Sequence, residues 1–158
     1  MDQNILQFGE GHSFPFAGGT LTIKEDGSRT RGELTVVEIE LPANSAAPPQ
    51  HLHRKHEETW YVLDGELEFT IGDESVRLGP GAWVLVPIGV PHTFRSSGDQ
   101  PARFLSTMTP GFYLEYFQEL ASRIGELSAA GEAPTPELLG RLGAELMPKY
   151  HTELVPAR

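Results

Sequence analysis

The spacing of turn residues limits what residues 18–109 can fold into. Short β-type runs follow one another there, separated by turn sequences such as Asp64-Gly65 and Gly72-Asp73. None of the gaps can hold the helix that joins parallel strands, so the strands must pair mainly antiparallel. The sequence therefore predicts an all-β sandwich or barrel. We expect strands at residues 20–24, 34–41, 59–63, 66–71, 76–78, 83–86, 92–95 and 103–108.

Beyond Pro110 the apolar residues recur every three or four positions instead of every two. This period predicts an amphipathic helix over residues 112–127. A second helix is expected after Thr135-Pro136-Glu137, which offers an N-cap, a first-turn proline and an acidic residue near the positive end of the helix dipole. We therefore expect a β-barrel with N-terminal strands over residues 1–110. We expect residues 111–158 to form a helical extension that packs on the barrel or against a second subunit of a homodimer.

Length and composition narrow the class of protein. The 158 residues fit one domain, and the 22 acidic residues outnumber the 12 basic ones, which gives a formal charge of -10. This balance argues against nucleic acid or an anionic membrane as partner. The chain has no cysteine, which excludes thiolate chemistry. Residues 1–20 lack the features of a secretory signal, so we expect a cytoplasmic protein.

Residues that bind metals are concentrated between His51 and Glu58. His51 and His53 are two apart, so in a strand they project from the same face. Glu58 shares its parity with the apolar Trp60 and Val62, and a bend after His53 would bring it to the same interior. A buried carboxylate is costly unless a positive charge compensates it. A divalent metal held by two imidazoles and this carboxylate would do so.

Other residues of the same types have simpler interpretations. We expect His12, His56 and His151 to be exposed or hydrogen-bonded and not to bind a metal. Glu57 has the opposite parity to Glu58, so we expect it to face solvent. The His51-x-His53 pair taken alone is about as compatible with a metal site as with an ordinary strand end. A second segment, residues 81–96, favours the metal site, because it places another histidine, His92, after an apolar run and a turn.

Together the two segments resemble the cupin family. Its first motif, G(x)5HxH(x)3-4E(x)6G, is matched by His51, His53, Glu58 and Gly65. Its second motif, G(x)5PxG(x)2H(x)3N, is matched by Gly81, Pro87, Gly89 and His92. Two positions depart from the motifs: Ser45 stands where the first opens with glycine, and Ser96 where the second ends with asparagine. The match of two separated motifs in both residue type and spacing makes the resemblance specific.

The resemblance covers residues 18–109 and implies a double-stranded β-helix of the jelly-roll kind, with a metal inside the barrel mouth. The family's ligands fall on His51, His53, Glu58 and His92. One divalent metal per chain, with open coordination positions, is implied. Such a site suits iron, manganese, nickel, cobalt or copper better than a closed structural zinc site.

Sequences outside the motifs, such as PGFYLEYFQEL, resemble the bacterial cupins described as quercetin 2,3-dioxygenase-like. That resemblance implies oxidative opening of a flavonol-like substrate by O2, with Glu58 as metal ligand and catalytic base. Aromatic surface for a planar substrate could come from Trp60, Phe69, Trp83, Phe94 and Phe104. Since cupin folds host unrelated functions, two alternatives stay open. They are a non-redox isomerase or polyketide-type cyclase, and a non-catalytic small-molecule-binding protein.

Overall fold

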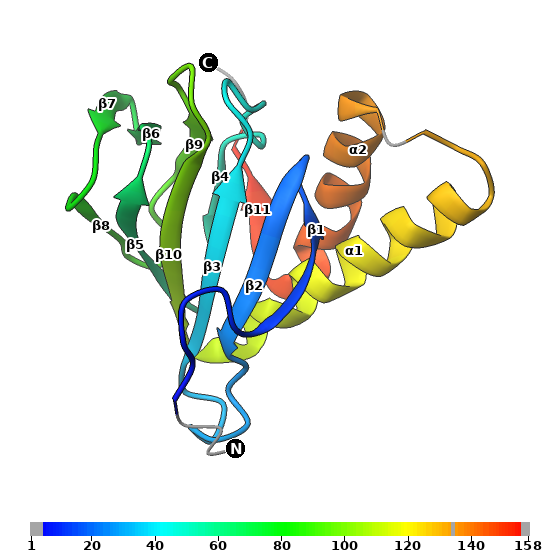
Figure 1. The fold of residues 1–158 in the computed structure, drawn as a ribbon, viewed down its shortest axis with the longest axis horizontal. Helices are drawn as coiled ribbons and strands as arrows, with labels where there is room; N and C mark the ends of the chain where they lie inside the picture. The colour runs from blue at the N-terminus through cyan, green and yellow to red at the C-terminus, as the bar shows by residue number, and fades with distance from the viewer. Residues whose placement is uncertain (1–4, 134, 156–158) are drawn as a thin grey trace.

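The computed structural model describes residues 5–133 and 135–155, which form two facing antiparallel sheets and a helical segment (Figure 1). In order across the six-stranded sheet lie β1 (His12–Phe16), β2 (Gly19–Glu25), β3 (Thr35–Leu41), β10 (Ala102–Thr109), β5 (Glu57–Asp64) and β8 (Trp83–Val86). In order across the five-stranded sheet lie β11 (Thr152–Leu154), β4 (His51–His53), β9 (His92–Ser96), β6 (Leu67–Ile71) and β7 (Glu74–Leu78). The predicted all-β jelly roll is confirmed.

The core lies between the sheets and follows the alternation of residues along the central strands. In β5 and β10 every second residue is buried, as expected for strands with one face on the core. Gly65 closes the turn after β5 with φ of 72°, and a Cβ atom there would approach the carbonyl oxygen of Pro101 to 2.3 Å. Only glycine fits this turn without displacing the neighbouring strand.

One aromatic residue expected in the interior lies outside it. In β8, Val84 and Val86 face the core, so Trp83 and Leu85 project outward. Trp83 is 59% exposed and pairs across the ladder with Tyr61, which is also exposed. The prediction that Trp83 lines a substrate pocket is therefore wrong. Both faces of β8 are apolar, so its hydrophobic pattern did not reveal which face is buried.

Three strands, β1, β4 and β11, are missing from the ranges expected from the sequence, although the same-face argument for His51 and His53 assumed a strand at β4. β1 contains Pro15 and lies at an edge of the six-stranded sheet, which is where a strand tolerates proline. β11 has only three residues, Thr152–Leu154, and no apolar alternation. It becomes a strand through its pairing with β4.

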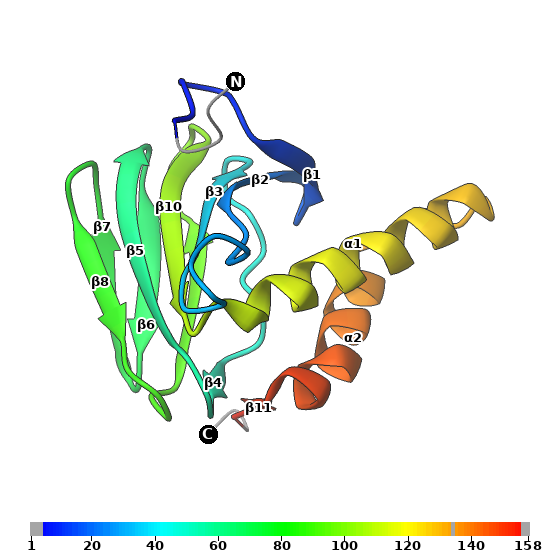
Figure 2. The same ribbon diagram turned by 90° about the horizontal axis from the view of Figure 1, so that it is seen from below.

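The segment after β10 begins with a short 3-10 helix, η1 (Gly111–Tyr113), followed by α1 (Leu114–Ala129), α2 (Pro136–Leu146) and a second 3-10 turn, η2 (Met147–Tyr150). Thr135 caps α2 as predicted, since its hydroxyl accepts a hydrogen bond from the Leu138 amide. Figure 2 shows α1 leaving the barrel and α2 returning beside it toward β11. The ring of Phe117 in α1 packs edge-on against Phe16 of β1. No helix in the described ranges has the length and apolar character of a membrane span.

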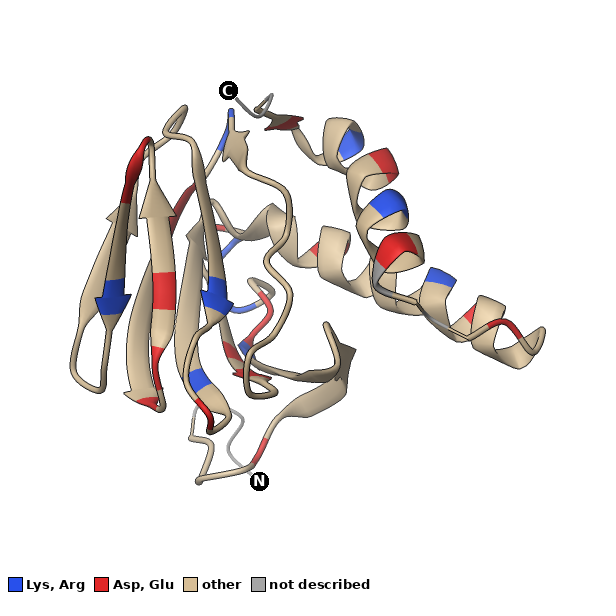
Figure 3. Cartoon of the chain, turned by 90° about the horizontal axis from the view of Figure 1, so that it is seen from above, with Lys and Arg blue, Asp and Glu red and all other residues tan. Residues whose placement is uncertain are grey.

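Charged residues of opposite sign are interspersed over the strands and helices (Figure 3). Several form pairs across neighbouring strands, such as Arg95 with Glu68 at 2.8 Å and Arg103 with Glu38 at 3.2 Å. Most of these pairs are at least partly exposed, so each contributes little to stability. The acidic excess is therefore spread over the surface among basic residues.

Candidate metal centre

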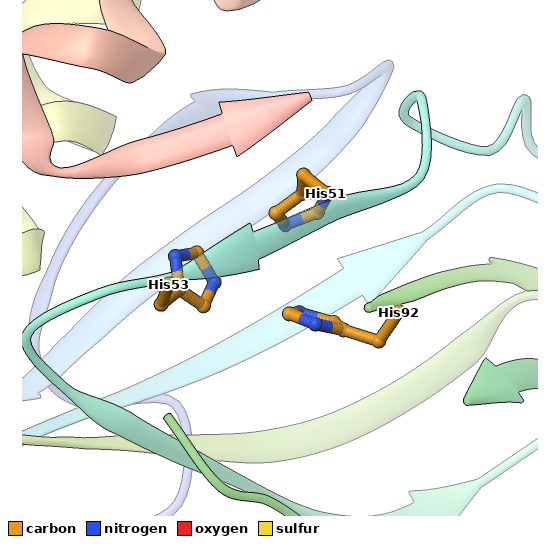
Figure 4. A group of neighbouring side chains, drawn as sticks. All are labelled: His51, His53 and His92. Carbon is orange, nitrogen blue, oxygen red and sulfur yellow. The ribbon is translucent and has the colours of Figure 1, made fainter. Parts of the chain in front are cut away.

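Three buried histidines meet where β4 lies beside β9. His51 and His53 project from the same face of β4, and His92 opens β9 directly opposite His51 in the ladder. The centre of the His92 ring lies 4.5 Å from that of His51 and 5.0 Å from that of His53 (Figure 4). One nitrogen from each ring can be chosen so that all lie within 4.8 Å of one another. The structure thus gathers the three predicted histidine ligands.

Backbone carbonyls determine which nitrogen of His51 and His92 carries the proton. Nδ1 of His51 lies 2.8 Å from the carbonyl oxygen of Pro49, and Nδ1 of His92 lies 3.1 Å from that of Val90. A carbonyl oxygen can only accept, so each Nδ1 donates its hydrogen. In the neutral ring this leaves the lone pair on Nε2. Such an outer hydrogen bond is the usual support of a metal-binding histidine.

His53 is held in the same tautomer by a side chain from the far end of the chain. Its Nδ1 lies 2.9 Å from Oγ1 of Thr152. The Thr152 hydroxyl in turn points to the carbonyl oxygen of Tyr150, at 3.4 Å, so it is free to accept the hydrogen of Nδ1. The lone pair of His53 is therefore also on Nε2. Three imidazoles thus have the same arrangement, with Nδ1 as donor and Nε2 free.

Glu58 adds a carboxylate to this group. After the bend at residues 54–56, Glu58 is 4% exposed. Glu57 lies on the other face of β5, as predicted, but it is half-buried and not fully in solvent. Oε2 of Glu58 lies 3.2 Å from Nε2 of His53 and 3.5 Å from Nε2 of His92. Neither contact has the alignment of a hydrogen bond, and both nitrogens lack a partner among the described residues.

Unpartnered lone pairs beside a carboxylate oxygen repel one another unless a cation lies between them. The donors are imidazole nitrogens and a carboxylate oxygen, a set that suits divalent transition metals. The side chains present therefore fit a metal ion, since His51, His53 and His92 form one compact group and Glu58 lies beside His53 and His92.

The protonation states also fit a metal. Burial, followed by the neighbouring His92 and His53, lowers the pKa of His51 to about 3. Burial also lowers the pKa of His53. For Glu58, burial alone raises the pKa, but the contacts with the surrounding imidazoles outweigh it and hold the pKa well below its usual value. Near neutral pH the two histidines are neutral and the carboxylate is ionised, so a metal has no proton to displace from them.

His56 is a neighbour of this group with the opposite arrangement. It is fully buried, and its Nε2 lies 3.1 Å from Oε1 of Glu58. Its Nδ1 has no partner among the described residues. The ring packs against those of His53 and Tyr113 with tilted planes, at centroid distances of 4.1 and 4.4 Å. His53, His56 and Glu58 form a second group compact enough for a metal. Because Nε2 of His56 already serves as donor to Glu58, we interpret His56 as support for that carboxylate.

The remaining two histidines, His12 and His151, are exposed, in agreement with their simpler interpretation.

The two positions that depart from the cupin motifs, Ser45 and Ser96, contact each other. The amide of Ser45 donates to Oγ of Ser96 at 2.9 Å, and the amide of Ser96 donates to Oγ of Ser45 at 3.0 Å. Both serines are buried, so the two departures together form one reciprocal link between the loop before β4 and the end of β9.

Aromatic rings fill the barrel interior beside His92. Trp60 lies 5.6 Å from the His92 ring and 4.9 Å from Phe69, and Phe94 packs on Phe69 and on Phe104. The indole N–H of Trp60 is buried and has no acceptor among the described residues. A buried donor without an acceptor is costly, so a polar atom of a bound molecule would satisfy it.

Three residues next to the site had not been assigned to it from the sequence: His56, Tyr113 and Thr152. His56 carried a local signal, because it lies inside the histidine-rich segment. Tyr113 and Thr152 carried none, because they lie in the segment after the barrel and reach the site only through its docking.

Comparison with known proteins agrees with this geometry. Residues 37–108 match the model of the cupin domain family. The chain is 33% identical over 91 residues to quercetin 2,3-dioxygenase of Bacillus subtilis, a match that covers 58% of the chain and 27% of that protein. It is 34% identical over 61 residues to polyketide synthase CurC of Streptomyces cyaneus, covering 39% of the chain and 40% of that protein. The chain thus spans well under half the length of these curated relatives.

A solved structure supports the fold. A predicted oxalate decarboxylase from Thermotoga maritima superposes with a TM-score of 0.61 and 18% identity, over 66% of this chain and 97% of that one. At this identity the likeness concerns the arrangement of the strands and not the reaction.

Proposed function

We propose that this chain, a member of the cupin superfamily, is a metal-dependent dioxygenase that opens an enolisable, hydroxylated aromatic or flavonol-like substrate. The observation that carries the proposal is the group of unpartnered Nε2 atoms beside the buried carboxylate of Glu58. The choice of reaction rests on the similarity to quercetin 2,3-dioxygenase, which is limited to part of that protein.

His51, His53, Glu58 and His92 would hold one divalent metal ion per chain. When bound, the ion supplies a net charge of about +1 after Glu58 is counted, which favours an anionic oxygen of the substrate and lowers the pKa of a coordinating hydroxyl. The Nδ1 hydrogen bonds of the three histidines hold their rings with Nε2 free for this role.

Glu58 is the group that accepts the proton of the substrate hydroxyl. Its carboxylate is ionised, buried and held at Oε1 by the N–H of His56. A positioned base of this kind contributes about 100-fold or more to the rate. Phe69, Phe94 and Phe104 pack together beside the His92 ring and keep this part of the interior apolar. The free N–H of Trp60 supplies a donor for an oxygen atom of the substrate.

A second candidate is a non-redox isomerase or polyketide-type cyclase. It is favoured by the 34% identity to polyketide synthase CurC over 61 residues. In that reaction Glu58 would move a proton between two positions of the substrate, without O2. The same residues serve both candidates, so the two differ in the need for oxygen and not in the site.

The test uses purified full-length protein loaded separately with Fe(II), Mn(II), Ni(II), Co(II) or Cu(II), with quercetin as probe and an oxygen electrode as detector. Oxygen uptake matched to loss of the flavonol, abolished by a chelator, is the expected result. Conversion without oxygen would favour the second candidate. Tight binding of the probe without conversion by any loaded form would contradict both and leave a binding protein.

Two variants sharpen this test. Glu58→Gln removes the base and should lower turnover by about 100-fold or more. Trp60→Phe keeps the aromatic packing and removes the indole donor, so it should raise KM more than it lowers kcat if the donor contacts the substrate.

A further inference from the structure

The strand that carries two of the proposed ligands is supported largely by the last strand of the chain. β4 has three residues, and in the ladder with β9 it is joined at His51 and His92. Along its other edge it pairs with β11 over its whole length, through Thr152↔His53, Glu153↔Leu52 and Leu154↔His51. Backbone hydrogen bonds flank this ladder on both sides, from Arg54 to His151 and from Val155 to Gln50, each at 2.9 Å.

We infer that β11 supports the metal centre by holding β4 in place, and that Thr152 is a positioning residue for His53. The inference rests on the metal site proposed above. Thr152 is 1% exposed, and its hydroxyl accepts the hydrogen bond from Nδ1 of His53 at 2.9 Å, across 99 residues of sequence.

Thr152 acts on His53 by selecting its tautomer. With the hydroxyl present, the ring keeps its hydrogen on Nδ1 and its lone pair on Nε2, which faces Glu58 and His92. Without the hydroxyl, metal binding would leave a buried Nδ1–H with no acceptor. Alternatively, the hydrogen would move to Nε2 and remove the lone pair that a metal needs. Either outcome weakens the binding of a metal.

Several contacts hold β11 in place for this role. Arg54 donates two hydrogen bonds to the carboxylate of Glu153, at 2.9 and 2.6 Å, which tie the end of β4 to β11. Just before β11, the buried Tyr150 donates its hydroxyl to Glu119 of α1 at 2.6 Å. The position of the Thr152 hydroxyl is therefore set by the docking of the whole segment after the barrel.

The experiment measures the affinity of full-length protein for Co(II), by visible absorption in competition with a chelator. Thr152→Val has the same shape and lacks the hydroxyl, and its affinity should fall by about 10- to 100-fold. Thr152→Ser restores the hydroxyl and should restore wild-type affinity. Thr107→Val is the matched control, because it removes a half-buried strand hydroxyl that pairs with Thr59 on the outer face of the barrel. Its affinity should equal that of the wild type.

A second readout reports the tautomer directly. In long-range 1H–15N NMR spectra of the metal-free protein, His53 should carry its hydrogen on Nδ1 in the wild type and in Thr152→Ser. In Thr152→Val it should shift toward the Nε2–H form. A loss of stability without a tautomeric change would show a merely structural role and overturn the inference. The wild-type spectrum needs no variant, so an Nε2–H tautomer there overturns the inference even if Thr152→Val fails to fold.

The outcomes also separate this inference from the proposed function. Wild-type affinity for Co(II) in Thr152→Val would overturn the role of Thr152 and leave the metal site intact. Absence of Co(II) binding by the wild-type protein would overturn the site, and the inference with it.

Discussion

The barrel and the segment after it reach the same site in different ways. The barrel supplies the three histidines and Glu58 from two short segments, whose spacing and strand parity already indicate a shared interior. The segment after Thr109 supplies Tyr113 and Thr152, which reach His53 only because the segment docks. The proposed ligands are therefore local features of the sequence, whereas their support depends on tertiary packing.

The largest expected effect comes from removing the second region altogether. Deletion of residues 112–158 exposes the barrel surface under α1, takes away the Thr152 hydroxyl and leaves β4 without its longer ladder. Several residues of this segment are buried: Tyr113, Leu114, Tyr116, Leu120, Leu146, Met147 and Tyr150. We expect aggregation and loss of Co(II) binding, measured by light scattering and metal analysis. A soluble truncate that binds Co(II) like the wild type would show that the barrel needs no such support.

A change in the first region should remove the metal and keep the fold. His53→Ala deletes one proposed ligand while the apolar core between the sheets is unchanged. We expect loss of stoichiometric Co(II) binding with a native circular dichroism spectrum, because a lost ligand costs affinity but not the core. His12→Ala is the matched control, since His12 is an exposed histidine at the start of β1. Full metal occupancy in His53→Ala would show that His53 is not a metal ligand.

Two adjacent glutamates test the inner face of β5. Glu58→Gln keeps the size of the side chain and removes its charge and basicity, so turnover should fall by about 100-fold or more, with metal binding weakened. Glu57→Gln, on the other face of the strand, should be close to neutral in turnover and in metal affinity. If Glu57→Gln were inactive and Glu58→Gln active, Glu57 and not Glu58 would be the carboxylate that faces the metal, and the assigned inner face of β5 would be wrong.

The smallest expected effect is a change in Tm when Glu119, which anchors the segment after Thr109, is substituted. Hydrogen bonds from Lys149 and then from Tyr150 lower the pKa of Glu119 to about 2. A carboxyl group whose folded pKa is depressed stabilises the protein above its unfolded pKa, which is 4.5 for Glu119. This contribution is lost as the pH falls through about 2. The Tm of Glu119→Gln should therefore lie slightly below that of the wild type at pH 7, and the gap should close toward pH 2.

Glu126→Gln is the control for this anchoring, because Glu126 is an exposed glutamate on the same helix. Its Tm should follow that of the wild type at every pH. A gap between Glu119→Gln and the wild type that widens as the pH falls would contradict the assigned role of Glu119.

Much of the fold and of the candidate site could be predicted, because strand parity and motif spacing are local properties. They placed Glu58 inside and Glu57 outside, and they required the bend that the structure has at residues 54–56. Parity failed for Trp83, because β8 is apolar on both faces and its pattern does not distinguish them. It also gave no sign that His56 is fully buried against Glu58.

The support of the site could not be predicted for a different reason. Thr152 lies in a three-residue strand, Thr-Glu-Leu, whose conformation depends on the edge of β4, and nothing in the local sequence specifies that partner. The same holds for Tyr113, whose ring is placed against His53 and His56 by a turn that follows the barrel.

The central claim is that one metal ion lies among Nε2 of His51, His53 and His92 and the carboxylate of Glu58. The most direct test is the anomalous scattering of a cobalt-loaded crystal at the cobalt edge. We expect one anomalous peak per chain within bonding distance of all four side chains. His56 should stay hydrogen-bonded to Glu58, and Thr152 to Nδ1 of His53. A peak bonded to His56 in place of His51 and His92, or a peak elsewhere on the molecule, would contradict it.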